Sequence, residues 1–188
     1  MQGPIMWGVV AVLVLLVAGV VYGYNRLVFN RARVAAAWSD IDVQLKRRSS
    51  LIPQLVASLK TYMAYESATL TALTEQRTQA QRAEASAPNE RGVVESQVSG
   101  ALKQVMARAE AYPELKADGA FLDLQKNLTA VEEHIQMARR YYNGAVRELN
   151  VLVESVPTNL LANAFGFTGA AYFTLDDASQ AEPPTMEF

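Results

Sequence analysis

An apolar run at the N-terminus sets the strongest limit on the fold of this chain. Residues 5–22 read IMWGVVAVLVLLVAGVVY, and Arg26 is the first charged side chain of the sequence. A helix needs about 20 such residues to cross the hydrocarbon core of a bilayer. A cleaved signal peptide, the alternative, carries positive charge before its apolar core and small residues after it. Here the arginines follow the run, so we predict that residues 1–25 are a retained transmembrane anchor.

The arginines after the run predict its orientation. Arg26, Arg31 and Arg33 are kept in the cytoplasm by the positive-inside rule, which places the short N-terminus outside. The same three side chains are the candidates for contact with lipid headgroups. Gly19 and Gly23 form a GxxxG pattern in the anchor, which indicates either close helix packing between two copies or only the usual frequency of glycine in membrane helices.

The rest of the chain carries all 17 basic and all 19 acidic side chains, one histidine and no cysteine. This balance does not indicate a nucleic-acid binder, and the missing cysteines exclude thiol nucleophiles and Cys/His zinc sites. Glu132, Glu133 and His134 contain metal-ligand types, but the single histidine lacks the partner four residues away that a helical zinc motif needs. We predict no catalytic, cofactor-binding or metal site, and no enzyme activity.

Apolar residues recur at three- and four-residue spacing in four segments, about residues 26–48, 52–83, 89–109 and 118–156. We expect Lys46, Arg47 and Arg48 to close the first helix, since cations suit a helix C-terminus. Ser50 is then the N-cap of the second helix, with Pro53 in its first turn; a continuous helix kinked at Pro53 is the alternative. Asn89 and Asp118 are the expected caps of the third and fourth helices.

The fourth segment has the most regular pattern, a coiled-coil-like seam from Phe121 to Val156 that Pro157 ends. Helices with one apolar stripe and short connections pack as a bundle. We therefore predict an all-α fold: a transmembrane helix, an antiparallel up-and-down bundle of about four helices over residues 26–157, and an extended acidic, aromatic tail over residues 158–188. Strand alternation is suggested only at residues 171–175.

Several stretches of this sequence resemble the LemA family over nearly the whole chain. They are YNRLV at 24–28, AWSDIDVQLKRR at 37–48, LIPQLV at 51–56, AYPELK at 111–116, LQ at 124–125, AR at 138–139, YN at 142–143, FGF at 165–167 and YF at 172–173. The sequence departs from the family pattern at Ser50, usually acidic, and at Gln54, usually Asn. The resemblance implies a bacterial inner-membrane protein with a helical-bundle domain, but no mechanism.

The two ends of the chain differ in charge. Residues 26–48 hold six basic and two acidic side chains, whereas no Lys or Arg follows Arg147. Aromatic side chains in an interrupted tail behave as anchors for a pocket, either on the same bundle or on a neighbouring copy. The candidate interaction residues are Trp38, Phe165, Phe167, Tyr172, Phe173 and Phe188.

We therefore expect a scaffold that forms homo-oligomers or organises partners at the membrane, and as an alternative an adaptor or regulator of an envelope enzyme such as a membrane protease or a sensor kinase.

Overall fold

The computed structural model describes residues 3–174, and it confirms the all-α class. The elements are α1 (Gly3–Tyr62), the short 3-10 helix η1 (Ala64–Glu66), α2 (Ser67–Arg82), α3 (Pro88–Ala109), α4 (Pro113–Lys116), α5 (Gly119–Glu154) and α6 (Thr158–Phe165). The chain divides into two compact units. The first is Met1–Ser39 with Tyr141–Ala170, and the second is Asp40–Arg140 with Ala171–Phe188. Helices α1 and α5 contribute to both.

Helix α1 begins with the predicted anchor. Every residue from Met6 to Tyr22 is exposed, and nearly all of them are apolar. Within residues 3–174, α1 is the one helix that is long and apolar enough to cross a membrane, judged by length and composition. An apolar surface of this extent is unfavourable in water but suits the lipid core of a bilayer.

The predicted helix end at Lys46–Ser50 is wrong, and the continuous helix is the one observed. α1 runs through Pro53 to Tyr62, and the Ser50 hydroxyl donates to the Arg47 carbonyl at 2.8 Å instead of capping a new helix. Proline lacks the N–H that would bond to the carbonyl four residues earlier, which belongs to Ser49. Arg77 of α2 replaces it, because its Nε donates to the Ser49 carbonyl at 2.8 Å. A tertiary hydrogen bond therefore satisfies the carbonyl that Pro53 leaves open.

This geometry predicts that the effect of Arg77→Met depends on residue 53. In the natural sequence we expect the substitution to lower the free energy of unfolding by about 1–2 kcal/mol, because the Ser49 carbonyl loses its donor. In a Pro53→Ala background the backbone N–H of the introduced alanine supplies that donor, so the loss should be smaller. Chemical denaturation of the four variants, followed by far-UV circular dichroism, measures the difference. If Arg77→Met lowers the free energy of unfolding equally in both backgrounds, Arg77 does not replace the missing N–H of residue 53 as the donor to the Ser49 carbonyl.

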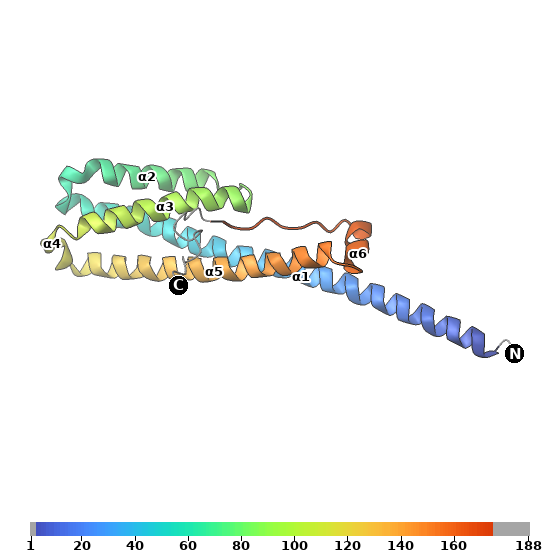
Figure 1. Ribbon diagram of the computed structural model, residues 1–188. Coiled ribbons are helices and arrows are strands. Elements are labelled where there is room, and N and C mark those ends of the chain that lie inside the picture. Colours follow the sequence, from blue (N-terminus) through green and yellow to red (C-terminus); the bar gives the residue numbers. More distant parts are fainter. Residues whose placement is uncertain (1–2, 175–188) are drawn as a thin grey trace, which may run out of the picture. The chain divides into compact units, whose positions relative to one another are not determined.

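The second unit is an antiparallel up-and-down four-helix bundle. It is built from the C-terminal part of α1, from α2 and α3, and from the N-terminal part of α5; Figure 1 shows α2 beside α3, and α4 at the turn between α3 and α5. The break between the first two bundle helices lies at Met63–Glu66 rather than near Ser50. The largest apolar core includes Ile52, Leu55, Leu59, Met63, Leu73, Val98, Leu102, Val105, Leu115, Phe121 and Leu128.

The predicted caps have different outcomes. Asp118 caps α5 as expected, because its Oδ1 accepts a hydrogen bond from the Ala120 N–H at 2.8 Å. Asn89 is not the cap of α3: the helix starts at Pro88, and the N-cap position is Ala87, which makes no side-chain cap bond. Proline suits the first helical positions because its missing N–H has no helical partner there.

The apolar stripe predicted for the α5 seam is mostly buried up to Leu152. Most of its predicted positions are buried, whereas Val156 is exposed because the helix ends at Glu154. The segment after Pro157 is not uniformly extended: it forms the short helix α6, which ends at Gly166 in a left-handed conformation with φ of 69°. Residues 167–174 then run without regular secondary structure, so the suggested strand at 171–175 is absent from its described part.

Candidate functional site

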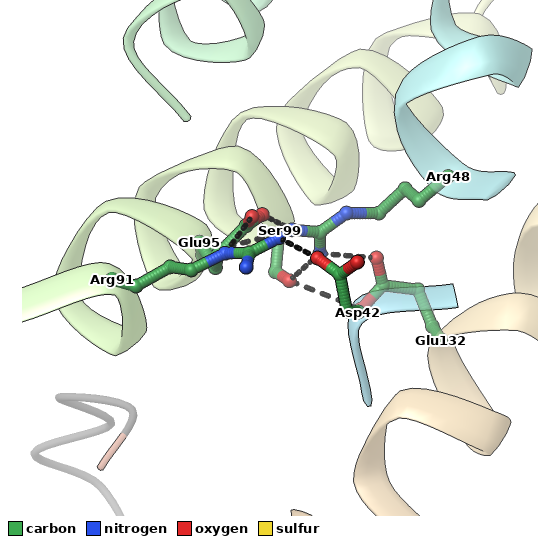
Figure 2. A network of polar contacts seen from close by, with 6 residues as sticks. All are labelled: Asp42, Arg48, Arg91, Glu95, Ser99 and Glu132. Atoms are coloured by element: carbon green, nitrogen blue, oxygen red, sulfur yellow. Dashed lines mark hydrogen bonds and ion pairs between the residues drawn. The ribbon is translucent and has the colours of Figure 1, made fainter. Parts of the chain in front are cut away.

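The most distinctive site of the second unit is a buried network of charged side chains around Arg48 of α1 (Figure 2). Arg48 is only 1% exposed. Its Nη1 donates to Ser99 of α3 at 2.6 Å and to Glu132 of α5 at 2.7 Å. Its Nη2 pairs with the carboxylate of Glu95 on α3 and also donates to the Glu95 carbonyl at 3.2 Å. One guanidinium thus joins three helices of the bundle.

Arg91 extends this network along α3. Its Nη2 donates to Asp42 of α1 at 2.7 Å, and its Nε lies 3.6 Å from Glu95 Oε1. Lys46 bridges Asp42, four residues earlier on α1, at 2.9 Å and Glu84 at 2.7 Å. Burial acts to raise the pKa of Asp42, but the hydrogen bonds from Lys46 and Arg91 outweigh burial and hold the pKa of this carboxyl below its ordinary value of 3.8.

A pocket of about 180 Å³ adjoins the network. It is lined by Leu45, Lys46, Arg48, Ser49, Ser50, Ile52, Arg77, Ala80, Gln81, Glu84, Arg91, Glu95 and Val98.

The charged groups of the network are paired with one another. Arg48 and Arg91 both face carboxylates, and Ser99 donates to Glu132 at 3.0 Å. Paired charges of this kind lock the register of helices, because a buried charge without its partner is costly. The arrangement therefore favours a structural role for this network.

The lowered pKa of Asp42 predicts a pH dependence of stability. Because protons bind Asp42 less tightly in the folded chain, its ionised form stabilises the fold above about pH 4, and this contribution is lost as the pH falls through the folded pKa. We expect the melting temperature of Asp42→Asn to fall less with decreasing pH below about pH 4 than the melting temperature of the unsubstituted protein. Thermal melts of detergent-solubilised protein at a series of pH values measure it. The matched control is Asp40→Asn, exposed on the same helix; an equal change there would contradict the assignment to Asp42.

The first unit holds most of the site residues predicted from the sequence. Arg26 is exposed. Arg31 lies over the ring of Phe167, 4.9 Å from its centroid. Arg33 pairs with Glu148 and donates to the Tyr141 hydroxyl at 3.3 Å. Two of the three arginines that were predicted to flank the membrane thus contact side chains of their own chain.

The predicted interaction aromatics also contact their own chain. Trp38 packs on Tyr142 with ring centroids 5.3 Å apart. Phe165 and Phe167 both meet Tyr24 edge to face, at 4.9 and 5.7 Å.

Phe173 is fully buried in the second unit, whereas Tyr172 is partly exposed. Phe188 lies outside the described residues. The described part of the tail therefore docks on its own chain, and the role of these residues in binding a partner stays a prediction.

The glycines of the GxxxG pattern have different surroundings. A Cβ added at Gly23 would lie 2.5 Å from Leu161 Cδ1 of α6, whereas nothing lies within 4 Å at Gly19. The Gly23 surface is thus already covered by the chain itself, and helix pairing through Gly19 stays a prediction.

Sequence reasoning missed several residues that hold the tail and the network, among them Asn150, Gly92 and Arg91. The Asn150 side chain accepts from the Ala170 N–H at 2.8 Å and donates to the Ala170 carbonyl at 3.1 Å. Gly92 leaves room for the backbone of Thr174, which an added Cβ would overlap. Arg91 is the third of these residues. It lies in register with the apolar stripe of α3, and a charged residue in such a register is a signal for a buried ion pair.

A second concave surface lies between α3 and α5 in the second unit. This α3–α5 groove has a volume of about 830 Å³ and mixes apolar and charged lining residues. They are Ser99, Leu102, Lys103, Met106, Ala107, Glu110, Leu128, Thr129, Glu132, Glu133, Gln136, Met137 and Arg140. A groove between two helices that is lined by both apolar and charged residues suits an amphipathic helix better than a small polar substrate.

Comparisons with known proteins agree with the family resemblance seen in the sequence. The family model described as the LemA family matches residues 37–188. Protein LemA of Metamycoplasma hominis is 24% identical over 165 residues, which cover 87% of this chain and 74% of that protein. Magnetosome proteins MamQ 1 and MamQ 2 of Paramagnetospirillum magneticum are each 25% identical over 181 residues, which cover 84% of this chain and 66% of each relative.

Proposed function

The chain belongs to the LemA family, and we propose that it is a non-enzymatic helical scaffold held at the cytoplasmic face of a bacterial inner membrane. One observation carries the proposal. The exposed apolar segment Met6–Tyr22 continues without interruption, as part of α1, into the bundle. An anchor that continues directly into the bundle tethers the bundle to the membrane, and confinement to that surface raises the local concentration of the protein.

The orientation follows from charge. No charged side chain precedes Arg26 in the sequence, and Arg26, Arg31 and Arg33 follow the apolar segment closely, so the positive-inside rule favours a cytoplasmic bundle. The absence of cysteine from the sequence gives a direct test. We expect a single cysteine at exposed Gln79 to be protected from a membrane-impermeant maleimide in intact spheroplasts and labelled after lysis. Labelling before lysis would contradict this orientation.

Self-assembly is the activity that we assign to this scaffold. The basic stretch after the anchor and the acidic C-terminal residues give one copy two ends of opposite charge, which favours contacts between neighbouring copies. Contacts too weak to hold free proteins together become effective between molecules confined to one membrane.

The decisive experiment measures the mass of the full chain in mild detergent by size exclusion with light scattering. A discrete large particle supports self-assembly, and a monomer contradicts it. The tail is best tested by deleting residues 175–188, because a deletion that begins at residue 170 also removes the buried Phe173 and disturbs the fold. Particles that shrink after this deletion would assign the contact to the tail.

The α3–α5 groove favours a second candidate, an adaptor or regulator of an envelope enzyme. In this case the groove takes an amphipathic helix of the partner. A second protein that co-purifies at fixed stoichiometry, and is lost on Met106→Lys in the groove, would favour this function. The control is Val43→Lys, an exposed apolar residue outside the groove.

A further inference from the structure

Helix α6 lies against α1 directly after the apolar segment. Leu161 of α6 covers Gly23, the residue after Tyr22, and the Phe165 ring contacts the ring of Tyr24 at 4.9 Å. On its inner side α6 packs into a small core formed by Leu27, Leu152, Ala162 and Phe167. All of these contacts are within the first unit, and they place α6 beside one turn of α1.

The height of that turn relative to a bilayer follows from helix geometry. At a rise of 1.5 Å per residue, Gly23 and Tyr24 lie about 2–3 Å beyond Tyr22, the last residue of the apolar run. The polar interface on each side of the hydrocarbon core is about 5–8 Å thick. If the apolar segment spans the core, α6 meets α1 within this interface. Tyrosine and tryptophan are enriched at that depth, and Tyr22 and Tyr24 would then lie there, with Phe165 beside Tyr24.

The outer side of α6 is uncovered and mostly apolar, with Asn163 as an exposed polar residue. Leu160 is 66% exposed, Phe165 is 55% exposed, and Val156 just before the helix is 78% exposed. Residues 156–165 contain no charged side chain. On the adjacent part of α1, the exposed side chains of Arg26 and Arg31 provide positive charge. Exposed apolar residues beside cations are typical of helices that lie in the membrane interface.

We propose that α6 is a second membrane contact, which lies in the interface with Val156 and Leu160 at the boundary between headgroups and acyl chains. Arg26 and Arg31 then meet anionic headgroups, and Leu161 packed on Gly23 couples the depth of α6 to that of the anchor. The lipid surface is the occupant that the position favours, because the apolar face continues directly from the membrane-spanning segment. This inference rests on the proposed membrane anchor.

Single-cysteine variants of the full chain test the proposal, since the natural sequence has no cysteine that would be labelled as well. Leu160→Cys is labelled with an environment-sensitive fluorophore in vesicles of phosphatidylcholine and phosphatidylglycerol. Quenching is measured with lipids that carry a spin label either near the headgroup or deep in the acyl chain. Val14→Cys in the anchor is the positive control. Val43→Cys, similarly exposed and 43 − 22 = 21 residues beyond Tyr22 on α1, is the negative control.

We expect the label at position 160 to emit at shorter wavelength than the label at 43 and to lose most of its emission to the shallow quencher. The label at position 14 should respond to the deep quencher. Quenching at 160 no greater than at 43, with position 14 quenched, would overturn the role of α6 and leave the anchor intact. No quenching at position 14 would overturn the anchor itself. In the Leu160→Cys variant, crosslinking between two copies without lipid quenching would show that α6 faces a second copy, and would also overturn the proposal.

Discussion

Replacing Arg48 by methionine is expected to lower the free energy of unfolding by about 3–5 kcal/mol, because breaking a buried ion pair from one side leaves charge without compensation. Arg48 is buried and holds Glu95, Glu132 and Ser99 together. Methionine has a similar length and fills part of the volume, so the loss reports on charge more than on packing. Chemical denaturation of the detergent-solubilised full chain, followed by circular dichroism, measures it.

Two further variants separate charge from packing. Arg48→Met combined with Glu95→Leu and Glu132→Gln removes the stranded carboxylates, and we expect it to recover much of the lost stability, as apolar replacements of buried ion networks often do. Arg47→Met on the exposed face of the same turn is the control and should change stability by less than about 0.5 kcal/mol. A loss below about 1 kcal/mol for Arg48→Met would mean that the network contributes little to the fold.

Phe173→Ala is the second large effect, with an expected loss of about 3–5 kcal/mol. The Phe173 ring is fully buried although it lies in a segment without regular secondary structure. Its removal leaves a cavity and releases residues 171–174 from the second unit, so we also expect protease to cleave this segment faster. Tyr172→Ala, the partly exposed neighbour, is the matched control and should have a small effect.

Gly92→Ala is expected to disturb the same segment, because Gly92 of α3 lies against the backbone of Thr174. The added Cβ would overlap the carbonyl oxygen of Thr174 and lie 3.0 Å from its carbonyl carbon, and a backbone cannot yield as a flexible side chain does. We expect the protease sensitivity of Phe173→Ala to reappear in Gly92→Ala. Wild-type cleavage rates in both variants would contradict the docking of the tail on its own chain.

The continuity of α1 is readable from its buried residues, although Pro53 argues against it. The buried positions Ile41, Leu45, Arg48, Ile52, Leu55 and Leu59 follow alternating spacings of four and three residues without a break. Arg48 lies on that stripe, which indicates a helix that continues. Its positive charge, however, is also typical of a residue at the C-terminal end of a helix. Local rules for proline and for terminal cations favour a break, and the donor from Arg77, 28 residues from Ser49, removes the cost of continuing.

Features that depend on local pattern could be predicted from the amino-acid sequence alone. The charge-free run, the helical periodicity, the Asp118 cap and the α5 seam each need only neighbouring residues, because hydrophobicity and hydrogen bonding along one helix decide them. Family membership likewise rested on short stretches such as residues 37–48.

The partners of the polar and tail residues, in contrast, became known only from the folded chain. Arg48 is 84 residues from Glu132, and Gly92 is 174 − 92 = 82 residues from Thr174. The local sequence around a charged side chain or a glycine does not show whether that residue faces solvent or another helix. Burial and pairing arise only when separate helices meet. For the same reason, α6 became a candidate membrane contact only once Leu161 was seen to pack on Gly23.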